Sequence, residues 1–257
     1  MDKDLQIPAE YTIRFQTAPI TPAPFSHFYT LRLDVRSAIE LWVDFGITYT
    51  ERDEMSEEDL IDEGFTANDD YHWSGKVPPV WINEFGEIFG SSKMIRKREE
   101  VEYEDFIEIE LEENNKNVTI YPVDKERWTY FLQEFMQAIF EASGKEKPFE
   151  MTYLEIGDGQ PFTLDLKASF ATKMLTLSKL GEKPQQLDWP KLQKIMDTVY
   201  RADFLADMAA RSRPNKPGKY ITAGDGLWYQ LGVSIVESAP KSKDLPKIDA
   251  LFVALRK

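Results

Sequence analysis

The sequence of 257 residues contains no cysteine, which excludes disulfides, thiolate zinc sites, iron–sulfur clusters and thiol nucleophiles. Histidine is nearly as scarce, with His27 and His72 alone. No apolar run approaches the roughly 18 residues that a membrane-spanning helix needs. The first residues, MDKDLQIPAE, lack the basic, apolar and small-residue regions of a secretory signal. The last two absences predict a soluble, cytoplasmic protein that does not enter a membrane, whereas the absence of cysteine does not identify the compartment.

Several catalytic fingerprints are also missing. The chain has no G-x-S-x-G elbow, no P-loop and no dinucleotide-binding motif. With 45 acidic residues, some pair of carboxylates could always lie at the separation that glycoside hydrolysis requires, so their number alone is not evidence for such a site. The sequence therefore predicts no cofactor, apart from the divalent metal considered below.

Negative charge is abundant and localised. The net charge is −14, and residues 51–113 hold 21 acidic and six basic residues, which leaves 24 acidic and 25 basic residues in the rest of the chain. Direct nucleic-acid binding is disfavoured, because phosphates would repel residues 51–113. A basic protein partner or a cation is favoured instead.

The clearest helical pattern lies at Asp124–Gly144, DKERWTYFLQEFMQAIFEASG. Asp124 is suited to cap the first turn, because its carboxylate accepts a hydrogen bond from a free backbone N–H, and Gly144 is a suitable end. A second long helix is predicted for residues 189–211, capped by Asp188. In the first helix the apolar side chains recur at spacings of three and four, which places them on one side. They are Trp128, Phe131, Leu132, Phe135, Met136, Ile139 and Phe140.

Alternation of apolar and polar residues predicts the strands. Residues 29–35 and 39–49 are separated by Ser37-Ala38, so a hairpin is expected, with a bulge or bend as the alternative. Three prolines make residues 18–24 a loop. Residues 245–255 form either a short helix or a strand. Further strands are predicted at residues 11–16, 101–111, 118–123, 149–156, 162–166 and 227–236.

Residues 51–92 interrupt the strand pattern. Ser56-Glu-Glu-Asp59 resembles a capping box that opens a short acidic helix ending near Gly64. The sequence FTANDDYHWSGKVPP, residues 65–79, is rich in turn formers and predicts a loop. A helix follows at residues 78–89, with its apolar residues on one side.

These elements predict one α+β domain over residues 1–257. Its core is a mainly antiparallel, twisted sheet with two principal helices packed on one face, plus an acidic helical insertion at residues 51–92. A sub-boundary near residues 93–100, around the basic connector Lys93–Arg98, is the alternative division.

Asp69, Asp70 and His72 are candidate metal ligands, because two carboxylates and an imidazole suit a divalent cation. His27 or a glutamate would complete the shell. The spacing matches no metal motif, and turn loops collect Asp and Asn for backbone reasons. Bound metal would make the protein a metal-assisted hydrolase.

Three further groups are candidate binding residues. Tyr71, Trp73 and Trp81 would line a cleft or form a small core beneath the acidic loop. Alternate glutamates form an acidic face suited to calcium, a basic peptide or nucleic-acid mimicry, although a one-sided sheet also requires such a face. Two arginines in the basic loop 211–219 would clamp a phosphate or remain solvated. The glutamates are Glu102, Glu104, Glu108 and Glu110, and the arginines are Arg211 and Arg213.

The favoured hypothesis is a non-catalytic binding protein that uses its acidic, aromatic-containing segment against a basic or cationic partner. A metal-assisted hydrolase that uses Asp69, Asp70 and His72 is one alternative. An acidic mimic of nucleic acid is the other. The sequence sets no oligomeric state.

Overall fold

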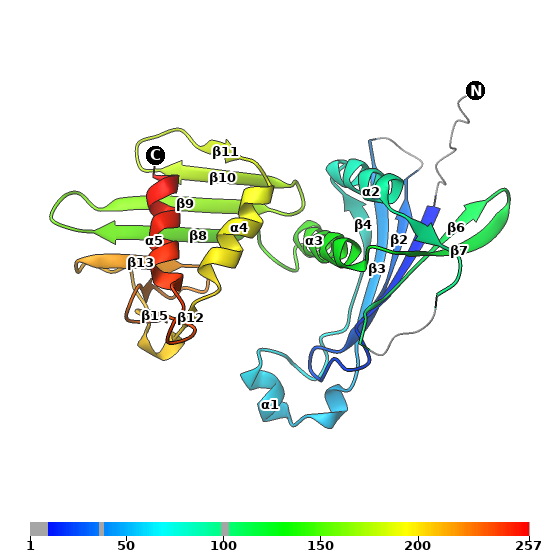
Figure 1. The fold of residues 1–257 in the computed structure, drawn as a ribbon, viewed down its shortest axis with the longest axis horizontal. Coiled ribbons are helices and arrows are strands. Elements are labelled where there is room, and N and C mark those ends of the chain that lie inside the picture. Colours follow the sequence, from blue (N-terminus) through cyan, green and yellow to red (C-terminus); the bar gives the residue numbers. More distant parts are fainter. Residues whose placement is uncertain (1–9, 36–38, 99–102, 257) are drawn as a thin grey trace. The chain divides into compact units, whose positions relative to one another are not determined.

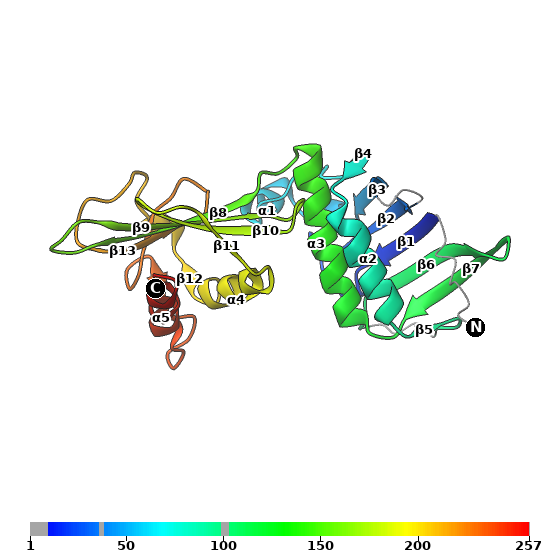
Figure 2. The ribbon, with the colours of Figure 1, turned by 90° about the horizontal axis from the view of Figure 1, so that it is seen from above.

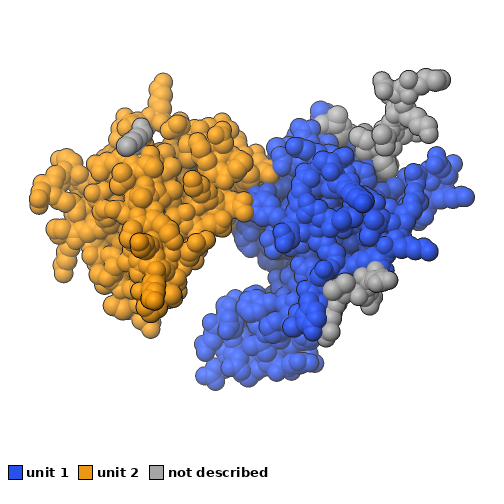
Figure 3. Space-filling model, viewed as in Figure 1, with its two compact units in different colours: residues 1–146 blue, residues 147–257 orange. Residues whose placement is uncertain are grey.

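The computed structural model describes residues 10–35, 39–98 and 103–256. The chain divides into two compact units, residues 1–146 and 147–257 (Figure 3). Each unit has its own antiparallel sheet and its own helices (Figure 1). The predicted α+β class is therefore confirmed.

Unit 1 contains a seven-stranded antiparallel sheet in the order β4-β3-β2-β1-β6-β7-β5. The pairing of β2 with β3 is continuous from His27 opposite Tyr49 to Asp34 opposite Trp42, as expected for the predicted hairpin. Residues 36–38, which include the Ser37-Ala38 connection, lie outside the described residues. The strands are β1 (Glu10–Gln16), β2 (His27–Asp34), β3 (Leu41–Tyr49), β4 (Tyr71–Val77), β5 (Met94–Ile95), β6 (Phe106–Glu113) and β7 (Lys116–Pro122).

Helices α2 (Val80–Ser91) and α3 (Lys125–Ser143) lie side by side on one face of this sheet (Figure 2). The Trp81 ring of α2 lies 4.7 Å from the Phe135 ring of α3, and the Trp128 Nε1–H donates to Ser92 Oγ at 2.9 Å. Alternate side chains of the strands fill the space beneath, because only one face of each strand points to the helices. Truncating one of these buried aromatic residues to alanine typically costs roughly 3–5 kcal/mol.

The caps predicted for α3 are confirmed. Asp124 accepts a hydrogen bond from the Arg127 N–H at 3.3 Å, and Gly144 ends the helix with a φ of 75°. A residue with a side chain would be strained in this left-handed conformation, which glycine adopts freely.

The segment between β3 and β4 holds a short 3₁₀ helix, η1 (Arg52–Glu54), and α1 (Glu57–Asp62). Ser56 caps α1 by accepting from the Asp59 N–H at 3.2 Å, as predicted. The helix lies beyond the ends of the strands, away from both faces of the sheet (Figure 1).

The prediction of a loop over residues 65–79 is wrong for Tyr71–Val77, which forms β4 and pairs with β3. Turn-forming residues are frequent in this segment, and its alternation of apolar and polar residues is short, so the sequence pattern does not reveal the strand. Tyr71 and Trp73 share the face of Phe45, while His72 and Lys76 point to the other side. With α2 in the core as well, residues 71–91 belong to unit 1 itself, and only residues 51–70 stand apart from its sheet.

Unit 2 contains a six-stranded antiparallel sheet in the order β11-β10-β9-β8-β13-β14, and β12 pairs with β15 beside it. Helices α4 and α5 cover one face of the sheet (Figure 2). The Tyr153 ring stacks on Phe252 of α5 at 4.2 Å within the core. The elements are β8 (Phe149–Ile156), β9 (Phe162–Ser169), β10 (Met174–Lys179), β11 (Gln185–Leu187), α4 (Pro190–Val199), β12 (Asp203–Phe204), η2 (Ala206–Met208), β13 (Gly218–Thr222), β14 (Tyr229–Gln230), β15 (Ile235–Val236) and α5 (Asp244–Leu255).

Four expectations that involve unit 2 need correction or completion. The helix predicted over residues 189–211 ends at Val199, because residues 203–204 pair with residues 235–236. The strand predicted at residues 227–236 is reduced to β14 and β15, because a turn between them joins the Ser234 N–H to the Gln230 carbonyl. Residues 245–255 are helical. The two principal helices of the prediction, α3 and α4, lie in different units rather than on one sheet.

The observed division falls after Glu146. The sequence placed a sub-boundary near residues 93–100, but β5 in that segment pairs with β7 of unit 1. Whether residues 1–257 behave as a single domain stays a prediction.

Candidate functional site

The acidic lobe, residues 51–70, holds ten acidic residues and one basic residue. It forms the part that projects at the lower left of the blue surface in Figure 3, where Figure 1 draws α1. Ile61 is 60% exposed in the middle of the lobe. Eight acidic residues of the lobe are exposed as well: Glu51, Asp53, Glu54, Glu57, Glu58, Asp59, Asp62 and Glu63.

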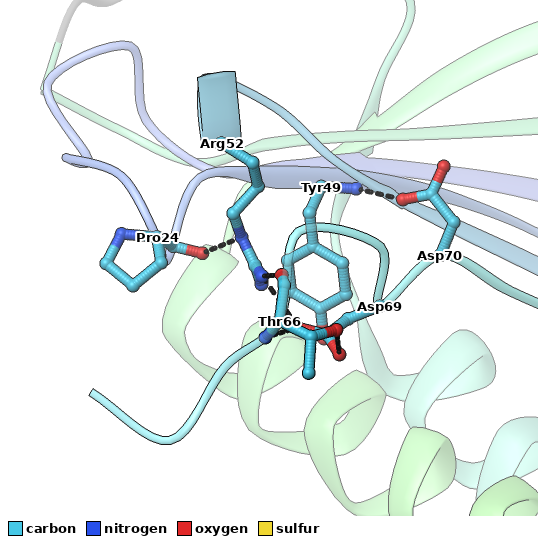
Figure 4. Close-up of polar contacts among 6 residues, drawn as sticks. All are labelled: Pro24, Tyr49, Arg52, Thr66, Asp69 and Asp70. Atoms are coloured by element: carbon cyan, nitrogen blue, oxygen red, sulfur yellow. Dashed lines mark hydrogen bonds and ion pairs between the residues drawn. The ribbon is translucent and has the colours of Figure 1, made fainter. Parts of the chain in front are cut away.

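Arg52 is the only basic residue of the acidic lobe, and it is 7% exposed. Its Nε–H donates to the Pro24 carbonyl at 3.0 Å, and its Nη1 donates to the Thr66 carbonyl and to Asp69 Oδ2, the latter at 2.6 Å (Figure 4). The guanidinium lies 4.3 Å from the centroid of the Tyr49 ring, a favourable cation–π contact. The positive charge is thus paired inside the lobe, and the exposed charged side chains of residues 51–70 are carboxylates.

Asp69 stabilises the loop at residues 66–69, to which Arg52 donates hydrogen bonds. Its carboxylate accepts from the Thr66 hydroxyl at 2.6 Å and from the Thr66 N–H at 2.8 Å. Partial burial by itself would raise the pKa of Asp69, but the Thr66 hydrogen bonds and the Arg52 charge outweigh it and hold this pKa below its ordinary value. Asp69 is therefore a structural anion rather than a free ligand.

The other two candidate metal ligands have different surroundings. Asp70 Oδ1 accepts from the Tyr49 N–H at 2.9 Å, and His72 Nε2 lies 3.3 Å from Asp44 Oδ2 on the outer face of the sheet. Both border an open hollow of about 590 Å³, together with Arg32. In the described part of the chain, no group of three histidine, aspartate or glutamate side chains is arranged to hold a metal ion. These contacts lend the hydrolase hypothesis no support.

His27, the suggested fourth ligand, lies at the start of β2. Its Nδ1 is 2.8 Å from the Phe25 carbonyl, and its ring stacks against Phe15 at 5.7 Å. Burial lowers the pKa of His27, against the opposing effect of the Phe25 hydrogen bond. His27 is thus a packed ring that favours its neutral form.

The candidate aromatic residues belong to the helix-covered face of the sheet. Trp81 is fully buried, which is incompatible with a place in an exposed cleft. Tyr71 meets Phe140 of α3 edge to face at 5.6 Å, with Lys145 Nζ 4.2 Å from the Tyr71 centroid. Trp73 lies over Gly75, where an added Cβ would be 2.3 Å from Trp73 Cζ2. The sequence alternative of a small core describes these residues better than a cleft does.

Internal cations offset the glutamate face of β6. Arg14 of β1 contacts Glu108 at 2.6 Å and Glu110 at 2.9 Å. Glu104 forms an ion pair with Lys125 at the start of α3. Glu102 lies outside the described residues. The described part of this face is therefore less acidic than the alternating glutamates suggest.

The two candidate arginines of the basic loop differ. Arg213 donates to Thr163 Oγ1 at 2.9 Å, and its guanidinium lies 5.8 Å from the Trp228 ring. Arg211 is exposed. The loop is thus fastened to unit 2 through Arg213.

Arg52 is the residue of the acidic lobe that the sequence did not single out. In the sequence, Arg52 is a single basic residue among ten acidic residues, with the aromatic residues Tyr49 and Phe65 on either side. Such a base is a candidate for a buried, paired cation rather than a surface charge.

No family model, no curated protein and no solved structure matches this chain. None of the helices in residues 10–35, 39–98 and 103–256 has both the length and the hydropathy that crossing a membrane requires. The function must be inferred from the residues of the chain itself.

Proposed function

We propose that the acidic lobe docks a basic segment of a protein partner, and that the protein acts by binding rather than by catalysis. The observation behind this proposal is that Arg52, the single basic residue of residues 51–70, is 7% exposed and paired with Asp69, so that the exposed charged residues of the lobe are all acidic. Lysine and arginine side chains of a partner would meet a complementary potential there.

Contacts within the chain hold the lobe in place without a partner. Leu60 is buried, and the Phe65 ring meets the Phe25 ring edge to face at 5.4 Å. Asp70 fastens the start of β4 to Tyr49. A preorganised surface loses little conformational entropy on binding, which favours affinity.

Ile61, 60% exposed, adds an apolar side chain to the charged lobe. Charged groups at the rim of an interface mainly accelerate association, whereas a desolvated apolar centre contributes to slow dissociation. The expected partner segment therefore combines basic residues with at least one aliphatic or aromatic side chain. A cytoplasmic location is part of the same proposal, supported by a sequence without long apolar runs.

The test is fluorescence anisotropy with a labelled peptide of alternating lysine and leucine residues. The lobe variant replaces four exposed carboxylates that accept no side-chain hydrogen bond within the described part of the chain, as Glu54→Gln, Glu57→Gln, Glu58→Gln and Asp62→Asn. We expect it to bind about tenfold more weakly at 0.15 M salt, since each exposed charge contributes roughly 0.2–1 kcal/mol. Higher salt should weaken wild-type binding, because ions screen exposed charges.

A matched variant makes the same change in net charge outside the lobe, as Glu126→Gln, Asp158→Asn, Asp197→Asn and Asp207→Asn, all at exposed positions. It should bind like the wild type. Equal losses in the two variants would show a general effect of charge and contradict docking at the lobe. Absence of binding to wild type at low salt would contradict the proposal entirely.

A further inference from the structure

Unit 2 contains an open hollow of about 550 Å³, which we name the aromatic hollow. Three aromatic side chains and two carboxylates line it, with small and aliphatic residues between them: Tyr200, Phe204, Tyr229, Asp203 and Asp225. No lysine, arginine or histidine is among the lining residues. Its volume lies in the range of small-molecule sites.

The rings come from three separate elements. Tyr200 ends α4, Phe204 belongs to β12 and Tyr229 belongs to β14. The centroids of Tyr200 and Phe204 are 5.7 Å apart, and those of Phe204 and Tyr229 are 5.0 Å apart at an interplanar angle of 69°. Because the rings are inclined to one another, they form a curved wall rather than a flat stack.

The turn Gly224-Asp225-Gly226 places one of the carboxylates. Both glycines have left-handed φ angles, 86° and 80°, which residues with side chains rarely adopt. Asp225 Oδ2 accepts from the Tyr229 hydroxyl at 2.7 Å, and Asp225 Oδ1 accepts from the Leu227 N–H at 3.0 Å. The hydroxyl bond orients the Tyr229 ring in the wall.

The tyrosines remain uncharged at neutral pH. Burial, followed by the hydrogen bond to Asp225, raises the pKa of Tyr229 to about 12. Burial, followed by the charge of Asp225, raises the pKa of Tyr200 to about 12. The charge that lines the hollow is therefore that of the carboxylates.

Asp203 supplies the free charge. Its side chain is exposed, and within the described residues no base forms an ion pair with it. An anionic ligand would be repelled by the two carboxylates, and a neutral ligand would desolvate them without a partner. An inorganic divalent ion needs more oxygen ligands than this wall of rings supplies.

An organic cation would interact favourably both with the aromatic rings and with the carboxylates that line the hollow. Aromatic faces attract cations electrostatically, and quaternary ammonium groups are bound in this way by aromatic cages. We propose that the aromatic hollow binds an organic ammonium group against Tyr200, Phe204 and Tyr229, with Asp203 and Asp225 balancing its charge.

The test is calorimetric titration of the full chain with choline. The control ligand is 3,3-dimethylbutan-1-ol, which has the shape of choline without its charge. Choline should bind, and the neutral isostere should bind at least tenfold more weakly. Equal binding of the two, or no heat with choline up to about 20 mM, would overturn the proposal.

Two exposed side chains allow substitution without disturbing the core. Asp203→Asn removes the free charge, and Tyr200→Leu keeps apolar volume but removes the ring, whose side chain is 44% exposed in the wild type. Each should weaken choline binding about fivefold, in line with a single cation–π or exposed ionic contact. Asp197→Asn, on α4 outside the hollow, should leave binding unchanged, and equal effects of all three would contradict the assignment. Thermal melts confirm that each variant is folded.

A second arm identifies the source of the ammonium group. Nα-acetyl-trimethyllysine amide presents it as a protein side chain would, whereas choline presents it as a free metabolite. Tighter binding of the lysine derivative supports a methylated protein ligand, and tighter binding of choline supports a small molecule. The four-residue lobe variant should bind choline like the wild type. The choline experiment therefore tests the aromatic hollow independently of the proposed docking at the acidic lobe.

Discussion

At the residue scale, Arg52 joins the loop before β2, the end of β3 and the acidic lobe through Pro24, Tyr49 and Asp69. Arg52→Ala removes these contacts and leaves Asp69 without its cation. We expect the free energy of unfolding of unit 1 to fall by about 2–4 kcal/mol, as for other broken, partly buried ion pairs. Urea denaturation followed by tryptophan fluorescence measures it.

Arg32→Ala is the matched control, because Arg32 is an exposed arginine on β2 of the same unit. Its effect should stay within about 0.5 kcal/mol. The double variant Arg52→Ala with Asp69→Ala should lose less than the sum of the two single variants, because the residues share one interaction. Full additivity would show that the ion pair does not couple them.

His27 makes a prediction about pH. Since burial lowers the pKa of folded His27 below the unfolded value of 6.5, the unfolded chain takes up a proton first as the pH falls. Stability should therefore decrease as the pH drops from about 6.5 through the folded pKa. His27→Gln should flatten this part of the stability profile, measured by denaturation at a series of pH values.

His72→Gln is the control for this experiment, since His72 is the other histidine of the chain and 68% of its side chain is exposed. The variant should retain the decrease assigned to His27. If His27→Gln keeps the wild-type slope, the buried ring is not its cause.

At the element scale, two glycines of unit 1 have opposite roles. A Cβ at Gly75 in β4 would lie 2.3 Å from Trp73 Cζ2, whereas a Cβ at Gly86 in α2 would meet nothing within 4 Å. Gly75→Ala should therefore destabilise unit 1 by about 1–3 kcal/mol, because the indole must move. Gly86→Ala should stabilise it by about 0.5–1 kcal/mol, because alanine is the better helix former.

Thermal denaturation of the two variants, which carry the same chemical change, tests this contrast directly. A loss of stability in Gly86→Ala would show that the exposed face of α2 is constrained by contacts other than those described. An unchanged melting temperature in Gly75→Ala would show that the Trp73 ring can leave its place over β4 without cost.

At the scale of the whole molecule, the two units have separate hydrophobic cores. The core of unit 2 is built from residues after 147, around Tyr153 and Phe252. Fragments 1–146 and 147–257 should therefore each fold and unfold cooperatively, because each closes its own sheet with its own helices. Circular dichroism melts measure this, with the full chain as the control. A fragment that melts without a cooperative transition would contradict it.

Much of the local structure was predictable. The side-chain spacing and the caps of α3 depend on neighbours within a few residues, and both the helix and its ends are found as expected. Ser56 and α1 follow the same rule. The strands with long alternation, such as β2 and β3, were also recognised, since a half-buried strand must alternate along its own length.

The candidate sites were less predictable, because they depend on partners far apart in the chain. The loop of Asp69 is rich in carboxylates, which makes Asp69 a candidate metal ligand from sequence, yet its carboxylate pairs with Arg52. The alternating glutamates of β6 are a candidate acidic face from sequence, yet Arg14 pairs with two of them from another strand. Charge neutralisation across a sheet depends on the strand order, which local periodicity does not contain.

The sequence by itself determined the α+β class, the acidity of residues 51–113 and the long helix at 124–144, because composition and short-range spacing are sufficient for these. Only the tertiary structure decided the division after Glu146, the pairing of β4 and the inward position of Arg52. It also decided that Tyr200, Phe204 and Tyr229 line one hollow. Each of these depends on contacts between segments distant in sequence, whose energies are set by which surfaces pack together.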